Sequence, residues 1–420
     1  MMSNFPAVGS TIRPLQYRDL QAVDHFAAFT KLGCWYGLGG ETAAWGQRLG
    51  ARTPLVSMLS WLPSSLHPVL RRYVRAYVLE CNGIIQGFIQ VSPFNHSRTT
   101  WQIDRMAIAN ADSGLGCGSP HAIGTQLIRH CLESCWEARM WLLMVDVNQN
   151  DGIALYRQNG FQPLAQFTEW EINGAVLEEL AANKTDLPNL MAVSNADAGL
   201  LYQLDTAAMP PQIRQVYDLG VSDFRWSPME RLVNYGTLLL EHNSEVSGYV
   251  FEPQRKAAIG YFNLLLHRAG HHEASAQVHD RCQLTVHPAY TWLYPDLMGQ
   301  IASIVMQAHP KRHESGSAQV PQNMPSNMPK LMVTSTDYQP EREAYLEQIQ
   351  AQRHSHHLLM GRSVWHKVRE TKPVLDALQL SRMLSGLQPA HRPVPGRIET
   401  PQPPSAHIYP HPWQFPDEMP

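Results

Sequence analysis

The sequence predicts an α/β (α+β) protein with two similar domains and a proline-rich tail. Three observations lead to this prediction. A strand, a glycine-containing turn and a helix follow one another within residues 101–135, and a second strand and helix come directly after them. Features of residues 1–180 recur between residues 190 and 370. Residues 371–420 are too rich in proline to build a core and are expected to form a disordered or extended tail.

The first domain is expected to span residues 1–180. Residues 11–20 read as a short strand and a turn, followed by a helix. Two strands flank the turn residues Asn82 and Gly83, which is a strong hairpin signal. The remaining elements are strands at 101–108, 142–147 and 161–172 and helices at 123–135 and from 153. The segment 181–189 is polar and is expected to link the domains.

The composition restricts the classes of function. The chain has 420 residues, of which 44% are hydrophobic and 16% charged, with a net charge of −3. This charge argues against a general nucleic-acid or membrane-surface binder and favours small-molecule or protein partners. No apolar run approaches the length of a membrane span, and the N-terminus lacks the features of a signal peptide, so the expected location is the cytoplasm. The six cysteines show no framework spacing, which favours reduced thiols.

The helix expected at 123–135 starts in a way that suits phosphate binding. Its apolar positions 123, 127, 128, 131 and 135 lie on one helix face. Unpaired N–H groups and the positive end of the helix dipole can receive a pyrophosphate at the helix start. Ser119, Ala122 and Gly124 are small residues that would let the backbone approach such a ligand.

These segments resemble the acetyl-CoA core of the GNAT family of N-acetyltransferases. The family's cofactor turn reads Arg or Gln, two residues, Gly, one residue, then Gly or Ala, and aligning IGTQLI puts Ser119, Ala122 and Gly124 at those places. Only the last glycine matches, and the turn is enlarged by ADSGLGCG. The segment QNDGIALYRQNGF resembles the family's Asn-x-x-Ala-x-x-Leu-Tyr followed by Gly-Phe, with Gln149 and Gly152 as departures. The matching residues are Leu155, Tyr156, Gly160 and Phe161.

The resemblance implies two domains, each a mixed, mostly antiparallel twisted sheet flanked by helices. It also implies transfer of an acetyl or other short acyl group from acetyl-CoA, the acyl-donor substrate, to an amine acceptor. Tyr156 would protonate the leaving thiolate, and Asp104 would be the general base. Region 45–77 would form the acceptor side. The residues implied in acetyl-CoA binding are Met106, Ala107, Ile108, Ser119, His121, Ala122, Ile123, Gly124, Thr125 and Asn150.

Both catalytic assignments have alternatives. Tyr156 could be a packing residue on an amphipathic helix. Strand alternation puts Asp104 on the same face as Met106 and Ile108, unless a bulge intervenes. Glu80 is a second candidate base, although a matching Glu241 in the second domain suggests a structural task for both.

The second domain, expected at 190–370, looks like a degenerate copy. Segment 238–253 repeats segment 77–93, with Leu, Glu, Asn and Gly shared at 79/240, 80/241, 82/243 and 87/248. Its turn contains Tyr294 and Asp296 in place of small residues, and an aspartate there would repel pyrophosphate. Leu346 stands at the position matching Tyr156. The second domain is therefore expected not to bind CoA, and the two halves are expected to pack as a pseudo-dimer.

Other groupings favour simpler interpretations. The histidines at 267, 271 and 272 and at 354, 356 and 357 lack the helical spacing with a carboxylate of a zinc site, so no metal site is expected and solvated histidines are favoured. The glycines at 114, 116 and 118 are not followed by Lys-Ser/Thr, so a P-loop is not favoured. The alternative to an enzyme is a catalytically silent scaffold or acyl-CoA sensor whose tail recruits a protein partner.

Overall fold

The computed structural model describes residues 10–19, 22–23, 74–109, 118–183, 186–228, 231, 234–235, 238, 243–267, 279–309 and 328–364. Several expectations concern residues outside these ranges. They are the helix after the first strand, most of the region at 45–77, the enlarged turn, the histidines at 271 and 272, Glu241 and the proline-rich tail.

The first half contains the predicted order of strands and helices. Its elements are β1 (Ser10–Pro14), β2 (Arg75–Cys81), β3 (Ile84–Pro93), β4 (Thr100–Ile108), α5 (Pro120–Ser134), β5 (Met140–Asp146), α6 (Asn150–Gln158), β6 (Gln162–Ile172) and α7 (Gly174–Ala182). Asn82 and Gly83 both have positive φ, at 51° and 80°, as the expected hairpin turn between β2 and β3 requires. Helix α7 was not predicted from the sequence, and its end overlaps the segment expected to be a linker.

The second half repeats this order. Its elements are β7 (Leu190–Ala192), α8 (Ala198–Ala208), α9 (Pro211–Tyr217), β8 (Asn243–Glu252), β9 (Ala257–His267), β10 (Asp280–Val286), α11 (Tyr294–Ala308), β11 (Leu331–Thr336), α12 (Pro340–Gln348) and β12 (Gln352–Ser363). Short 3₁₀ helices lie at Asn195–Asp197, Val221–Phe224 and Pro288–Leu293. Helices α5 and α11 have equal lengths, as do α6 and α12, which supports the duplication.

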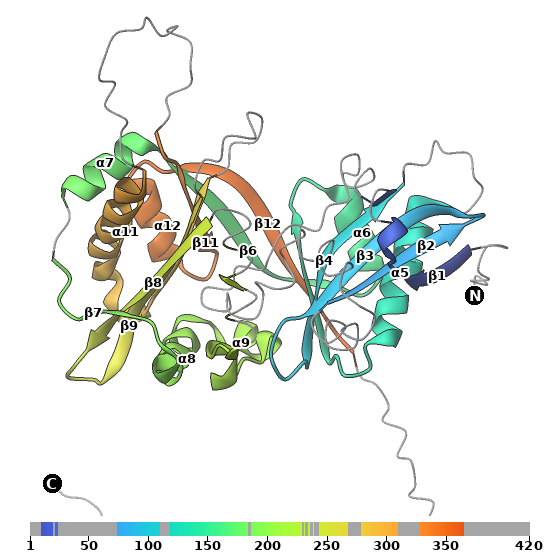
Figure 1. The fold of residues 1–420 in the computed structure, drawn as a ribbon, viewed down its shortest axis with the longest axis horizontal. Coiled ribbons are helices and arrows are strands. Elements are labelled where there is room, and N and C mark those ends of the chain that lie inside the picture. The colour runs from blue at the N-terminus through green and yellow to red at the C-terminus, as the bar shows by residue number, and fades with distance from the viewer. Residues whose placement is uncertain are drawn as a thin grey trace, which may run out of the picture. The chain divides into compact units, whose positions relative to one another are not determined.

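The described strands form one 12-stranded sheet in the order β1-β2-β3-β4-β5-β12-β6-β11-β10-β9-β8-β7. The last strand of each half is exchanged, because β12 pairs with β5 while β6 pairs with β11 (Figure 1). The two exchanged strands also pair with each other, and Phe167 lies opposite His357 in that pair. Equivalent strands occupy equivalent places on either side of this pair, so it marks an approximate two-fold axis. The strand expected at 161–172 was assigned to the first domain, and no local sequence pattern indicated this exchange.

Helices cover both faces of the sheet. Helices α5 and α6 pack on one face of β4, β5 and β12 through a core that includes Trp101, Trp141 and Met360. On the opposite face, α9 of the second half packs against β5, β6 and β12, with Ile213 and Met144 in the same cluster. The second half therefore contributes both a strand and a covering helix to the first.

The structure corrects the proposed alignment of the two halves. Gly87 lies on β3 and pairs with the end of β4. Gly248, its proposed match, lies on β8, which is the equivalent of β2. The true counterpart of Gly87 is Gly260, which pairs with the end of β10. A Cβ at either Gly87 or Gly260 would lie within 3 Å of side chains on the covering helical segment, so both strands need glycine there for close packing.

Two further expectations can be compared with the structure. Cys131, Cys135 and Cys282 are free and buried, as expected. Cys81 is disulfide-bonded, so the expectation that every cysteine is reduced is wrong. Within the described residues, no helix is long and apolar enough to cross a membrane.

Candidate active site

Strands β4 and β5 diverge at the point where the candidate site begins. They are paired in parallel only from Thr100 to Gln102 on β4. Beyond Gln102, β4 continues to Ile108 along β3, while β5 continues along β12. Among the described strands, none pairs with this edge of β4 from Ile103 onward.

A β-bulge in β4 lies at this divergence. Gln90 pairs with Arg105 and Val91 with Ile103, so Asp104 is the extra residue in the register. Ile103 and Met106 consequently both face the core beneath α5, although they are three residues apart. Plain alternation put Asp104 on the same face as Met106, and that expectation is wrong because the bulge intervenes.

The Asp104 carboxyl lies among polar side chains on the opposite face. Its Oδ1 accepts hydrogen bonds from Gln102 Nε2 at 2.7 Å and Ser92 Oγ at 2.9 Å. Gln90 Nε2 lies 3.5 Å from Oδ2. All four side chains are buried, with Asp104 only 4% exposed. Burial raises the pKa of Asp104 to about 7, although the hydrogen bonds oppose this shift.

The edge of β4 that β5 has left presents backbone donors. The Ala109 N–H donates to Gln86 O on the β3 side. Because alternate residues of a strand direct their N–H groups to opposite edges, Met106 and Ile108 direct theirs to the edge that β5 has left. Both residues were expected to contact acetyl-CoA, and Ala107 lies between them with its N–H directed to β3.

Helix α5 begins just after β4, and its first turn is partly capped. Ser119 is the N-cap residue, and its Oγ accepts from the Ala122 N–H at 3.3 Å. Pro120 has no N–H, and the Ile123 N–H bonds to Ser119 O. His121 Nδ1 is buried without a hydrogen-bond partner. Ser119, His121 and Ala122 are therefore at the helix start, as the resemblance implied.

Gly124 has a packing role that the sequence did not reveal. A Cβ there would lie 2.6 Å from Leu155 on α6 and 2.9 Å from Ile108 on β4. The missing side chain thus lets α5, α6 and β4 meet. Thr125 Oγ1, one residue on, accepts from Asn159 Nδ2 at 3.2 Å. Gly124 and Thr125 therefore face protein, and Ile123 is buried as well.

Two predicted site residues lie on α6. Tyr156 is fully buried in the core that α5 and α6 share, with its ring edge-on to Phe161 at 6.0 Å. Asn150 is the first residue of α6 and is exposed. The structure therefore puts Tyr156 beneath the sheet on the α5 side, and Asp104 on the other side of β4.

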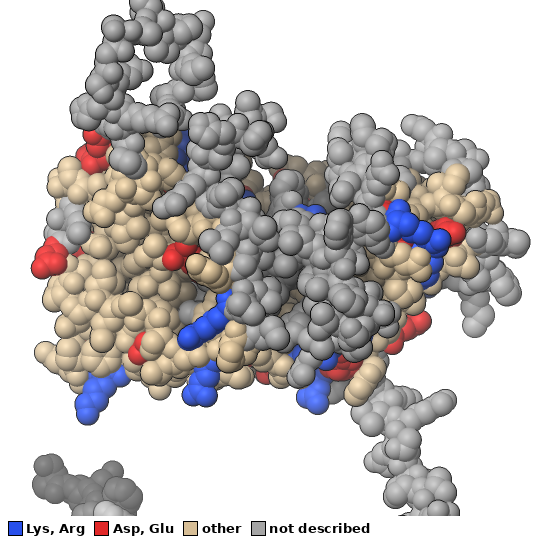
Figure 2. Space-filling model, viewed as in Figure 1, with Lys and Arg blue, Asp and Glu red and all other residues tan. Residues whose placement is uncertain are grey.

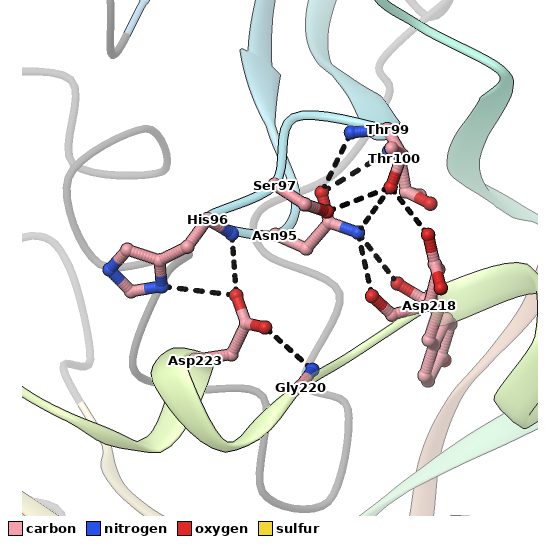
Figure 3. Close-up of polar contacts among 9 residues, drawn as sticks. Asn95, His96, Ser97, Thr99, Thr100, Asp218, Gly220 and Asp223 are labelled. Atoms are coloured by element: carbon pink, nitrogen blue, oxygen red, sulfur yellow. Dashed lines mark hydrogen bonds and ion pairs between the residues drawn. The ribbon is translucent and has the colours of Figure 1, made fainter.

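The face of the sheet that contains Asp104 is closed at one end by a contact between the halves. Figure 3 shows the loop between β3 and β4 against the segment that follows α9. Asn95 Nδ2 donates to Asp218 O at 2.9 Å, and Thr99 Oγ1 donates to Asp218 Oδ2 at 2.6 Å. Asp223 Oδ1 accepts from the His96 N–H and lies 3.0 Å from His96 Nδ1. These bonds fix α9 over the sheet, and sequence reasoning missed them because they join residues more than 100 positions apart.

Glu80, the second candidate base, has a structural role. It accepts a hydrogen bond from Arg13 Nε at 2.7 Å on the neighbouring strand. Arg13 also pairs with Asp19, which holds the pKa of Asp19 below its usual value. Glu80 therefore joins β1 to β2.

The equivalent place in the second half lacks a carboxylate. Strands β9 and β10 pair without a register shift, and Gln283 lies opposite Asn263. At the start of α11, Tyr294 is buried and stacks on Tyr345 with ring centroids 5.8 Å apart. Asp296 lies in the first turn of α11. The equal lengths of α6 and α12 match Tyr156 with Leu346, as the sequence indicated.

The described histidines differ in their exposure and surroundings. Among the described residues, no group of three or more His, Cys, Asp or Glu side chains could hold a metal ion. His356 is exposed, but His357 is only 7% exposed, so the expectation of solvated histidines is wrong for His357. On the face shown in Figure 2, the described Lys and Arg side chains are scattered and lie among Asp and Glu.

Comparison with known proteins gives structural matches only. No protein-family model matches the chain, and no curated protein sequence does. A tandem GNAT protein from the clavulanic acid biosynthesis pathway is 12% identical, with 84% of this chain and 98% of that chain covered at a TM-score of 0.48.

Two other solved structures are similar to the same extent. A GCN5-related N-acetyltransferase from Sphaerobacter thermophilus is 12% identical over 84% of this chain and 95% of its own, with a TM-score of 0.47. A putative acetyltransferase from Pyrococcus horikoshii is 10% identical over 87% and 93%, with a TM-score of 0.42. Identities this low say nothing about substrate, so function must follow from the residues of this chain.

Proposed function

We propose that the first half transfers an acetyl or other short acyl group from acetyl-CoA to an amine. One observation above all supports this proposal. A buried carboxyl, Asp104, lies on a bulge where β4 leaves β5, and its pKa is raised to about 7. A carboxylate with this pKa can remove a proton at neutral pH, and burial is the usual means by which enzymes produce one.

The backbone around Asp104 suits an acyl-CoA thioester. The N–H groups of Met106 and Ile108 would bind the pantetheine arm and polarise the thioester carbonyl, because they face the edge of β4 without a strand partner. The start of α5, at Ser119 to Ala122, would receive the pyrophosphate. Donors held by a strand and a helix need little reorganisation when charge develops on the carbonyl oxygen.

The chemistry would be a direct transfer. The amine nitrogen bonds to the carbonyl carbon, and Asp104, acting directly or through a water, takes the proton that the nitrogen loses. The carbon–sulfur bond then breaks, and Tyr156 supplies a proton to the departing sulfur. The products are an amide and free CoA. In this scheme Tyr156 on α6 is the general acid, and Asp104 on the opposite face of β4 is the general base.

Enzymatic assay of the full chain tests the proposal. Acetyl-CoA is incubated with a panel of primary amines, and the thiol of released CoA is measured. We expect release that depends on the amine and rises as the pH passes through about 7, because Asp104 must be ionised. Acetyl-CoA at 100 times its dissociation constant should also add roughly 2.7 kcal/mol of stability. Absence of both effects would favour a silent scaffold.

A further inference from the structure

A histidine on the exchanged strand β12 has an unsatisfied nitrogen on the same face as Asp104. His357 is 7% exposed, and its Nδ1 is buried without a hydrogen-bond partner. Its neighbours across the two adjoining strands are Asp146 on β5 and Phe167 on β6. A buried polar atom without a partner costs free energy, so it calls for an explanation.

The tautomer of the neutral His357 ring is set by two hydrogen bonds of Ser355. Ser355 Oγ donates to Glu169 Oε2 at 2.7 Å, so the hydroxyl proton is already used. Ser355 Oγ also lies 2.9 Å from His357 Nε2, and it can take part there only as an acceptor. The neutral imidazole therefore holds its proton on Nε2, and Nδ1 is left as a hydrogen-bond acceptor.

The relay is absent from the symmetry-related strand. Because His357 and Phe167 face each other at the approximate two-fold axis, Ser355 corresponds to Ala165. The strand beside β5 of the first half thus has Ser and His, whereas the strand beside β11 has Ala and Phe. The half with the Asp104 carboxyl is also the half that receives the free imidazole nitrogen.

We propose that His357 Nδ1 binds the amine acceptor of the first half through a second N–H donor of that acceptor. This inference rests on the proposed acetyl transfer. Strand β5 lies between β4 and β12, and β4 diverges from β5 beyond Gln102, so Asp104 and His357 are separated by at least two strand spacings, about 10 Å. Met144 is an apolar side chain of the intervening strand on this face. The acceptor class is therefore a diamine whose two nitrogens are joined by an apolar spacer of at least that length.

A pair of matched substrates tests the assignment. 1,8-Diaminooctane and octylamine differ only in the second nitrogen, and the extended diamine spans roughly the strand separation. We expect the KM of wild-type protein for the diamine to be at least about 10-fold below that for octylamine, since the lost bond has a charged donor. His357→Phe should remove this difference and leave kcat and the KM for acetyl-CoA within about twofold.

Control variants separate binding from a merely structural role. His356→Phe changes the exposed neighbour on the other face of β12 and should keep the preference for the diamine. Ser355→Ala frees Nε2 and should reduce the preference in part. It also serves as the test if His357→Phe fails to fold. An unchanged preference in both His357→Phe and Ser355→Ala overturns the proposal.

Calorimetry distinguishes this inference from the proposed function. If wild-type protein acetylates neither amine, the proposed function fails. Direct titration with 1,8-diaminooctane then decides the role of His357. Tighter binding to wild type than to His357→Phe supports an amine site at Nδ1, and equal binding overturns it.

Discussion

The β3–β4 pair of the first half and the β9–β10 pair of the second have the same place in the sheet but different chemistry. The first pair has a bulge that directs Asp104 away from the core, whereas the second pair is regular. Gln283 and Asn263 occupy the regular pair, and neither amide can act as a base at neutral pH. The half that has the bulge in its register therefore has a titratable carboxyl, Asp104, on this face of the sheet.

The helices that follow these strands, α5 and α11, also differ in how well their starts could accept an anion. The start of α5 is formed by Ser119 and small residues, with a serine cap. The start of α11 is filled by Tyr294 and has Asp296 in its first turn. An anion would meet bulk and negative charge there. The two halves thus share their packing, whereas the groups proposed here for acyl transfer belong to the first half.

Truncation should produce the largest effect. A fragment of residues 1–180 lacks β12, so β5 loses its partner and β6 loses both of its neighbours. We expect this fragment to lack a cooperative thermal transition or to be insoluble, because exposed strand edges aggregate. Circular dichroism and size-exclusion chromatography measure this. A fragment of residues 1–366, which form one compact unit, is the control and should fold. A stable monomer of residues 1–180 would show that the strand exchange is not needed.

Asp104→Asn should have the next largest effect. It keeps the size of the side chain and removes the base, so acetyl transfer should fall by roughly 10²–10⁴-fold. Gln283→Asn, on the corresponding face of β10 in the second half, should leave turnover unchanged. Steady-state kinetics on both variants make the comparison, and equal losses in the two would assign chemistry to both halves.

The same variant should change the pH dependence of stability. Because the folded pKa of Asp104 is raised from 3.8 to about 7, the folded state holds this proton more tightly than the unfolded state. The contribution of Asp104 to stability is therefore present at low pH and is lost as the pH rises from about 4 to about 7. Denaturant unfolding at several pH values should show this loss in wild type but not in Asp104→Asn. If the free energies of unfolding of wild type and Asp104→Asn changed with pH in the same way, the Asp104 carboxyl would have an ordinary pKa.

Tyr156→Phe should have a smaller effect on turnover. The phenol would donate a proton to a thiolate whose conjugate acid has a pKa of about 8.5, so the help required is modest. We expect turnover to drop by about 10²-fold while the KM for acetyl-CoA and the melting temperature barely change. Tyr345→Phe on α12 is the matched control and should not alter turnover. Unaffected turnover in Tyr156→Phe would make the tyrosine a packing residue.

Local sequence signals predicted the elements well. The Asn82-Gly83 turn, the apolar face of α5 and the match of Tyr156 with Leu346 depend on residues close together in the chain. The strand exchange depends on β6 pairing with β11 and β12, which are distant in sequence. The residues near β6 in the chain do not determine that pairing. The repeat at 238–253 misled because Gly248 lies on β8, the equivalent of β2, whereas the counterpart of Gly87 is Gly260 on β9.

The candidate site was predictable in part. The sequence indicated Asp104 and the start of α5, but the direction of Asp104 depends on a bulge set by the pairing of β3 with β4. Gly124 was assigned to a phosphate contact, whereas its place between Leu155 and Ile108 is visible only once α6 is packed. The role proposed for His357 requires a strand from the other half. Contacts of this kind arise from tertiary structure and leave no local pattern.

The number of acetyl-CoA molecules bound per chain tests the central claim most directly. Isothermal titration calorimetry of the full chain should give one site, because among the described residues the first half combines Asp104, the edge of β4 that β5 has left and a serine-capped helix start. Ala122→Glu, which adds negative charge in the first turn of α5, should abolish that site, while Asp296→Ala in α11 should leave it unchanged. Two sites, or a single site that survives Ala122→Glu, would contradict the division of the chain into one half that binds acetyl-CoA and one that does not.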